Sequence, residues 1–128
     1  LDSVKGIEKH QVLDAVTASV AAGIDAVCSF MVPFPQDTAA TLQESLEFMR
    51  EVRESGSRIF LSYTCPFPGT AFYENADDLG LRVLTEDWGE FDAKHVVIET
   101  SNLSAAEIEA AVEGMAANLG MNRSTIPA

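Results

Sequence analysis

The chain has 128 residues, of which 47% are hydrophobic and 22% charged, a balance typical of one folded globular domain and not of a disordered segment. Its formal net charge of -12 argues against a nucleic-acid partner, because phosphate contacts need clustered Lys and Arg side chains. No run approaches the roughly 18 apolar residues of a membrane span, and the first residues do not resemble a signal peptide, so we expect a cytoplasmic protein.

The first predicted helix covers residues 8–22. Val12, Val16 and Val20 recur at every fourth position, which is helical spacing, and Gly23 follows as a typical helix-ending glycine. Residues 24–32 are a nearly continuous apolar run that is too short for a second helix. Such a run is typical of a strand that is buried on both faces of a parallel sheet.

After a short turn, the second predicted helix runs to Ser55, and either Asp37 or Thr38 can cap it. Its inner face is expected to carry Ala39, Leu42, Leu46, Met49 and Val52. Gly56 ends this helix, and residues 58–63 are predicted to form the next strand. The order helix, strand, helix, strand, with connections long enough to cross over a sheet, predicts parallel strand pairing.

The most informative segment follows that second strand, where residues 66–70 read Pro-Phe-Pro-Gly-Thr. Two prolines end a strand and set the direction of the exit loop, because proline fixes φ and cannot donate to a sheet ladder. Gly69 permits a tight bend, and Thr70 can cap a short helix that runs to about Leu79. A rigid loop at the carboxyl end of a strand is where α/β barrels and open sheets bind ligands. The alternative is a connection that carries no site.

The remaining third of the chain is less regular at first. Within residues 81–94 the candidate for a brief strand is 83–84, and residues 95–99 are predicted to form another strand. Ser104 and Glu107 form a capping box that opens the last helix. The apolar side of that helix is Ile108, Val112, Met115 and Leu119.

Three helix-covered strands make an α/β fold that is only part of a barrel or open sheet. Such a piece leaves a strand edge and apolar surface unpaired. Either the fold closes in a compact way of its own, or copies of the chain associate with one another. The tail over residues 120–128 is expected to be frayed.

Residue types alone reveal little chemistry. Cys28 and Cys65 do not form a CxxC pair, so we expect no metal site, and both are expected to be small buried apolar groups. His95 could be an acid–base group or a residue at a strand edge. The chain has no nucleophile elbow, glycine-rich phosphate loop or HExxH motif. On this basis alone the chain is an acidic α/β domain.

Several short motifs also follow one another in a distinctive order. They are residues 5–7 (KGI), 22–24 (AGI), 30–38 (FMVPFPQDT), 66–70 (PFPGT) with Tyr73, Trp88 with 91–92 (FD), and 100–104 (TSNLS) with Glu107. Over most of the chain this order resembles the second half of the radical SAM barrel. The likeness is greatest to the branch whose members often carry a cobalamin-binding domain ahead of the barrel, such as anaerobic magnesium-protoporphyrin IX monomethyl ester oxidative cyclases and related methylases.

The resemblance implies a partial TIM-like barrel with parallel strands and covering helices. Residues 1–128 would then be a single domain, a fragment from the carboxyl-side part of the barrel. Members of the family usually read FMIGFPGET where this chain has residues 30–38. Pro33 and Gln36 therefore replace glycines, which narrows the freedom of the backbone near a ligand, and Asp37 replaces a glutamate.

The resemblance also implies which residues form the site. In the family the strand that ends at residue 32 passes under the adenosine of S-adenosylmethionine. Val32 would touch the adenine, Phe34 would line the site and Asp37 would support the turn. The matching wall would be Tyr63 and Thr64. The residues facing the substrate or closing the barrel mouth would be Phe67 and Tyr73.

The implied reaction is the reductive cleavage of S-adenosylmethionine to a 5'-deoxyadenosyl radical, which abstracts hydrogen from a small organic substrate. The parent enzyme would be an oxidoreductase or methyltransferase, with cobalamin as a further cofactor. The CxxxCxxC loop that holds the family's 4Fe-4S cluster is absent here, so we expect the cluster ligands in the rest of the parent chain and no activity from this fragment alone. Two alternatives stay open: a non-catalytic α/β interaction module, and a barrel enzyme of another type that uses His95 and nearby acids.

Overall fold

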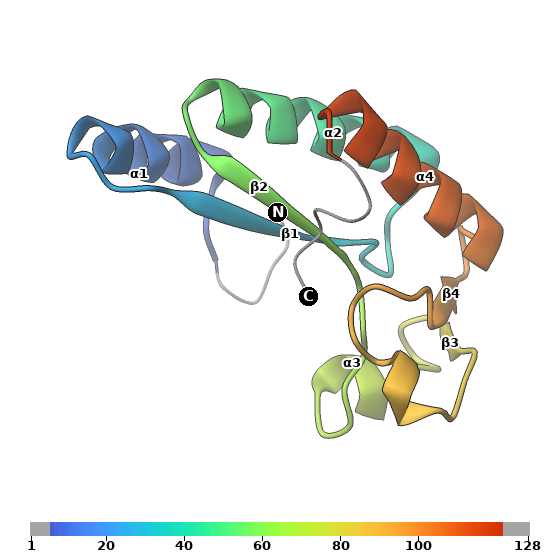
Figure 1. Cartoon of the computed structure of the whole chain (residues 1–128). Coiled ribbons are helices and arrows are strands. Elements are labelled where there is room, and N and C mark those ends of the chain that lie inside the picture. Colours follow the sequence, from blue (N-terminus) through green and yellow to red (C-terminus); the bar gives the residue numbers. More distant parts are fainter. Residues whose placement is uncertain (1–5, 122–128) are drawn as a thin grey trace.

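Two small sheets organise the computed structural model, which describes residues 6–121 (Figure 1). The first half of the chain forms α1 (Lys9–Ala21), β1 (Val27–Val32), α2 (Ala39–Glu54) and β2 (Arg58–Tyr63). The two strands pair in parallel through the whole of their length, and α2 is the crossover between them. This arrangement confirms the predicted α/β class and the predicted parallel pairing.

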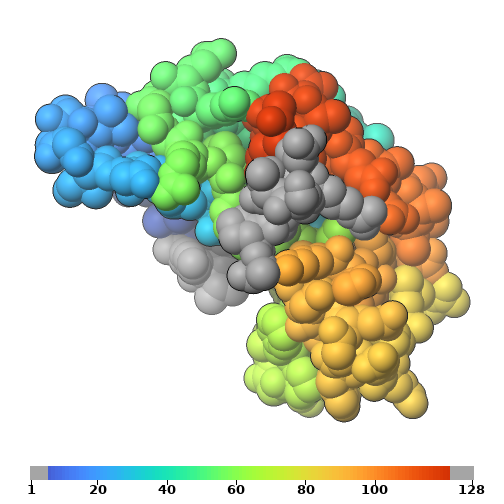
Figure 2. All heavy atoms as spheres, viewed as in Figure 1, coloured from blue at the N-terminus to red at the C-terminus, as the bar shows by residue number. Residues whose placement is uncertain are grey.

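The second half of the chain is built from shorter elements. It contains α3 (Ala71–Glu74), β3 (Leu81–Val83), the 3-10 helix η1 (Trp88–Glu90), β4 (Ile98–Thr100) and α4 (Ala105–Asn118). Strands β3 and β4 form a separate antiparallel pair. The segment from α3 to β4 makes a lobe of its own, which projects from the rest of the molecule in Figures 1 and 2.

The predicted strand over residues 95–99 is wrong in its start and in its pairing. The side chain of Asp92 accepts hydrogen bonds from the backbone N–H groups of Lys94 and His95, at 2.8 and 3.2 Å, and these bonds hold the segment in a turn. A backbone bond joins this turn to β2, from the N–H of Tyr63 to the carbonyl of Ala93 at 2.9 Å. The strand therefore begins at Ile98 and pairs with β3.

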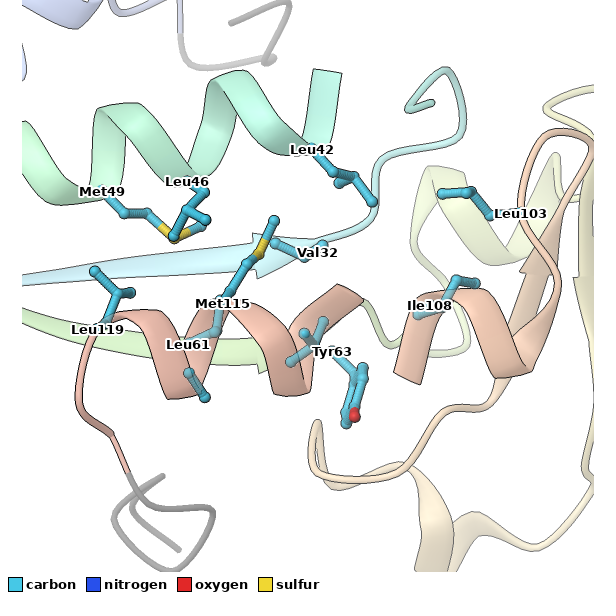
Figure 3. Close-up of a cluster of buried hydrophobic side chains, with 12 residues drawn as sticks. Val32, Leu42, Leu46, Met49, Leu61, Tyr63, Leu103, Ile108, Met115 and Leu119 are labelled. Atoms are coloured by element: carbon cyan, nitrogen blue, oxygen red, sulfur yellow. The ribbon is translucent and has the colours of Figure 1, made fainter. Parts of the chain in front are cut away.

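The helices α1, α2 and α4 all lie along one side of the β1–β2 pair (Figure 1). The largest buried cluster is formed where α2 and α4 pack on the two strands, and Figure 3 shows side chains from all four elements meeting there. Its members are Val32, Leu42, Leu46, Met49, Leu61, Tyr63, Leu103, Ile108, Val112, Met115, Ala116 and Leu119. Burial of this apolar surface is the main stabilising term of the fold.

The predicted inner face of α2 is largely confirmed, with one exception at its start. Leu42, Leu46, Met49 and Val52 are buried, whereas Ala39 is exposed at the first helical position. A further buried residue, Phe48, packs against α1 beside Val16 and meets Phe30 edge to face at 6.0 Å between ring centroids. α2 is therefore covered on two sides, by α1 and by α4.

The opposite face of the β1–β2 pair is open. Residues 27–32 alternate between exposed and covered side chains, so the prediction of a strand buried on both faces is wrong. Val27 and Met31 are 49% and 40% exposed, Ser29 between them is exposed, and Phe60 on β2 is half-buried. None of the four belongs to a buried cluster within residues 6–121. Association of copies through the strand edge stays a prediction.

The other expectations have mixed outcomes. The short helix predicted to reach Leu79 ends at Glu74, and turns continue to Gly80. Residue 5, the first residue of the first motif, lies outside the described residues. So do residues 122–128 of the tail. Within residues 6–121, no helix combines the length and the apolar character that crossing a membrane requires.

Truncation of the central core residue tests this packing. Leu61 is 0% exposed between α2 and α4, so Leu61→Ala should lower the free energy of unfolding by about 2–5 kcal/mol, from lost burial and the cavity left behind. Gln43→Ala on the exposed side of α2 is the control and should change it by no more than about 0.5 kcal/mol. Urea titration measures both. Equal effects would contradict the core described here.

Candidate functional site

The carboxyl ends of β1 and β2 lie side by side, and a proline-containing loop follows each strand. Val32 stands opposite Tyr63 in the parallel register. Beyond this point the two loops are tied together, because the N–H of Thr64 donates to the carbonyl of Val32 at 2.9 Å and its hydroxyl donates to the carbonyl of Pro33. Thr64 is 1% exposed, and the Val32–Pro33 peptide is cis. The paired loops form one fixed edge above the sheet.

The loop over residues 33–38 is organised by the carboxylate of Asp37. One oxygen accepts a hydrogen bond from the N–H of Phe34 at 2.7 Å, and the other accepts from the hydroxyl of Thr41 at 2.8 Å. Thr38, not Asp37, caps α2, in a capping box with Thr41. The carboxylate thus closes the turn and leaves the Phe34 side chain half-buried at the end of β1.

The loop over residues 64–70 leads directly into α3. Thr70 caps this short helix through its side chain, and its hydroxyl donates to the carbonyl of Phe67 at 2.6 Å. Gly69 has φ of +83°, a left-handed backbone angle that glycine adopts readily, and Glu74 accepts a hydrogen bond from its N–H at 3.2 Å. Phe67 at the tip is 48% exposed.

Aromatic rings connect the first loop to the lobe. Phe34 meets Phe72 of α3 edge to face, at 6.1 Å between ring centroids. Further along, the rings of Tyr73 and Trp88 lie 6.1 Å apart, and those of Trp88 and Phe91 lie 4.9 Å apart. Residues from both loops, α3 and η1 therefore form one continuous region at the carboxyl end of the parallel strands.

The structure places the expected site residues in two groups. The side chains of Val32 and Tyr63 belong to the buried cluster under α2 and α4 and do not lie on the open face of the sheet. Thr64 is buried as well, between the two loops. By contrast, Phe34 and Asp37 are half-buried in the first loop.

The two expected substrate-facing residues lie in the second loop and in α3. Phe67 is exposed at the loop tip, and Tyr73 is half-buried on the wall of a cavity. A ligand role for any of these residues stays a proposal.

Sequence reasoning missed the side chains on the open face of the sheet. Ser29 and Met31 on β1, and Phe60 and Ser62 on β2, are exposed or half-buried there. The available signal was the two serines, which are polar residues at alternating positions inside otherwise apolar strands. This face mixes apolar and hydroxyl groups directly beneath the two loops.

His95 has the partner that the sequence could not identify. Its Nδ1 lies 2.9 Å from Oδ1 of Asp92, in an exposed turn. Partial desolvation favours a higher pKa for the Asp92 carboxyl. Hydrogen bonds to its charged form outweigh this effect; they come from the His95 side chain and from the backbone of Lys94 and His95. Together with the attraction of His95, they hold the pKa below the ordinary 3.8. The turn therefore presents a carboxylate that stays charged in mildly acidic solution.

The Cys65 thiol is not poised for chemistry. Burial raises the pKa of the Cys65 thiol above its ordinary 9.0, and the negative charge of Asp92 raises this pKa further. A hydrogen bond with the Ala93 backbone lowers the pKa but does not cancel the increase. A protonated thiol is a poor nucleophile and metal ligand. Cys28 is half-buried, so the expectation that both are buried holds for Cys65 alone. In the described part of the chain, no three His, Cys, Asp or Glu side chains are grouped to hold a metal ion.

Two cavities open on the lobe. The larger, of about 980 Å³, lies among α3, β3 and η1, and its walls include Tyr73 and Trp88. The smaller, of about 580 Å³, lies between the β3–β4 pair and the start of α4. Glu99 on the wall of the smaller cavity has a lowered pKa, because the backbone N–H of Ala105 and the side chain of Arg82 both donate hydrogen bonds to its carboxylate.

Comparison with known proteins shows a distant similarity to a methyltransferase. No model of a known protein family matches the chain. The chain is 26% identical, over 104 residues, to an uncharacterized methyltransferase of Pyrococcus horikoshii. The match covers 81% of this chain and 22% of the relative, so the chain spans about a fifth of the length of the protein it resembles. The chain is thus weakly homologous to a protein described as a methyltransferase.

The charge of Asp92 should make stability depend on acid pH. Since its pKa is lowered in the folded state, the stabilisation is present above the ordinary 3.8 and is lost as the pH falls through the lower folded value. Asp92→Asn keeps an acceptor oxygen and removes the charge. The difference in unfolding free energy between wild type and Asp92→Asn should therefore be present at pH 6 and shrink below about pH 4. Urea titration at pH 6 and pH 3 measures it. A difference that is the same at both pH values would contradict this role.

Proposed function

We propose that this chain is the carboxyl-side part of a radical SAM barrel and forms one wall of its S-adenosylmethionine site. The layering of the β1–α2–β2 unit is the observation that carries the proposal. One face of the parallel pair is buried under α2 and α4, whereas the other face is open. A strand in an α/β barrel has this arrangement, with helices outside and the barrel interior on the other side.

The open face and the two loops offer groups that suit S-adenosylmethionine. Met31 and Phe60 present apolar surface for an adenine ring, and Ser29 and Ser62 present hydroxyl groups beside them. Phe34 lies at the end of the same strand as Met31, in the turn that Asp37 closes. These residues would bind and orient the ligand. Met31, Ser62 and Phe34 lie toward the carboxyl ends of the strands, where α/β folds usually bind ligands, and the Ser29–Phe60 pair lies two positions further in.

The residues inferred from the resemblance fit this wall in a particular way. Val32, Tyr63 and Thr64 would contribute through their backbone atoms, since their side chains are buried. Phe67 and Tyr73 would face the substrate from the second loop and α3. When bound, S-adenosylmethionine would supply a 5'-deoxyadenosyl radical after reductive cleavage, or a methyl group in a conventional transfer. The relative described as a methyltransferase supports S-adenosylmethionine as the ligand.

The residues of this chain do not fit a 4Fe-4S cluster. Cys28 packs beside α1 and α2, and Cys65 belongs to a different cluster beyond the end of β2. A cluster needs at least three converging thiolates. The proposal therefore places the cluster ligands, and any cobalamin, elsewhere in the parent protein, and the chain alone would be inactive. We also propose that the parent protein turns over a substrate, and that residues 1–128 form a single domain.

A second candidate is an enzyme that uses His95. The 2.9 Å contact between His95 Nδ1 and Asp92 Oδ1 favours it, because a carboxylate that orients an imidazole is a recurring acid–base arrangement. However, His95 is exposed and lines neither of the two cavities described above. The open sheet face is the more extensive site. A non-catalytic interaction module would use neither feature.

Filling the open face tests the proposal in the protein that contains this chain. Ser29 is exposed on that face, so Ser29→Trp should weaken S-adenosylmethionine binding by at least about tenfold through steric exclusion, while the protein stays folded. Gln43→Trp, equally exposed on the outer side of α2, should leave binding unchanged. Titration calorimetry under anaerobic conditions measures both affinities.

The products separate the two kinds of chemistry. Radical cleavage yields 5'-deoxyadenosine and methionine, whereas a conventional methyl transfer yields S-adenosylhomocysteine, and chromatography after an anaerobic reaction with a reductant distinguishes them. Equal binding by Ser29→Trp and Gln43→Trp would refute the open face as the ligand wall. Formation of S-adenosylhomocysteine alone would refute the radical assignment.

A further inference from the structure

Most of the larger cavity of the lobe has no role in the proposed function. It has a volume of about 980 Å³ and takes its walls from α3, β3, η1 and the turns between them, with no residue of β1 or β2 among them. Figure 2 shows these segments, coloured lime to orange, gathered in the projecting lobe. The cavity shares Tyr73 with the residues proposed to face the substrate, but it shares none of the residues proposed to bind S-adenosylmethionine.

Two aromatic rings form part of the wall. The ring centroids of Tyr73 and Trp88 are 6.1 Å apart, their planes are inclined by 49°, and both residues line the cavity. Phe91, which is buried, supports Trp88 at 4.9 Å, yet Trp88 remains 56% exposed. An indole that is fixed in place and open on one side is well suited to a positively charged group, because its π face carries partial negative charge.

Carboxylates form much of the remaining wall. The cavity is lined by Glu74, Asp77, Asp78 and Glu86, and within residues 6–121 none of these four takes part in an ion pair. Residues 71–92 contain seven acidic residues and one basic residue, Arg82. Arg82 does not neutralise the cavity, because it is paired with Glu99 on β4. The local potential is negative and attracts cations.

We propose that this cavity binds an organic cation, a quaternary or protonated alkylammonium group, with its charge on the faces of Trp88 and Tyr73 and the carboxylates around it. A bare metal ion fits less well, because it needs several converging oxygen ligands, and the described residues contain no grouped set of three. An anionic ligand is disfavoured by the four carboxylates. The combination of aromatic faces and acidic groups is the one that recognises alkylammonium compounds.

The chain contains its own reporter for this test, because Trp88 is its only tryptophan. Choline should change the tryptophan fluorescence of the full chain in a saturable way. The uncharged compound of the same shape, 3,3-dimethylbutan-1-ol, should bind at least about tenfold more weakly, since only the charge differs. Equal affinity for the two compounds, or no saturable change with choline, would overturn the proposal.

Variants measured by calorimetry locate the site. Trp88→Leu should weaken choline binding at least about tenfold, and Trp88→Phe, which keeps an aromatic face, should restore most of it. Glu86→Gln should weaken binding and reduce its dependence on salt. Glu47→Gln, exposed on α2 away from the cavity, is the matched control and should bind choline like the wild type. Equal losses in Glu86→Gln and Glu47→Gln would contradict the assignment.

Folding of each variant is checked by circular dichroism, and Trp88→Phe keeps the test valid if Trp88→Leu does not fold. Ser29→Trp, which fills the face proposed for S-adenosylmethionine, should leave choline binding unchanged, since Ser29 does not line this cavity. The two proposals can therefore fail separately.

Discussion

The packing of α2 and α4 on one face of the β1–β2 pair is the constraint on which the rest of the structure depends. Leu61 and Met49, both 0% exposed, lie at its centre, and most of the largest buried cluster comes from these four elements. Because successive side chains of a strand point to opposite faces, burying one set leaves Ser29 and Met31 on the open face. The same packing aligns the ends of both strands, so the two loops emerge together.

The lobe depends on the parallel pair for its position and on its own small core for its shape. Cys65, Leu81, Phe91, Val97 and Ile98 form that core. The bond from Tyr63 to Ala93 and the edge contact between Phe34 and Phe72 join it to the end of the sheet. The Tyr73–Trp88 pair, the carboxylates of the larger cavity and the turn with His95 therefore all belong to this lobe.

Much of the fold could be predicted because it depends on local patterns. The spacing of Leu42, Leu46 and Met49 identified the inner face of α2, and Ser104 with Glu107 identified the start of α4. The strand predicted over residues 95–99 was wrong in its start, since the side chain of Asp92 binds backbone groups that a strand would have used and β4 begins only at Ile98. The open face was missed because apolar residues occur on both sides of β1, and the sequence pattern does not show which side has a partner. Val32 and Tyr63 were expected in the site because of the family resemblance. A resemblance locates a strand in the fold but does not say which way its side chains point.

The carboxylate of Glu99 limits which groups can bind at the start of α4. The Glu99 carboxylate accepts a hydrogen bond from the backbone N–H of Ala105 in the first turn of α4. The Glu107 carboxylate accepts one from the backbone N–H of Ser104. Helix starts in α/β proteins commonly anchor the phosphates of nucleotide cofactors through such groups. Here the position is already filled by negative side chains, so a nucleotide with a pyrophosphate would meet repulsion there.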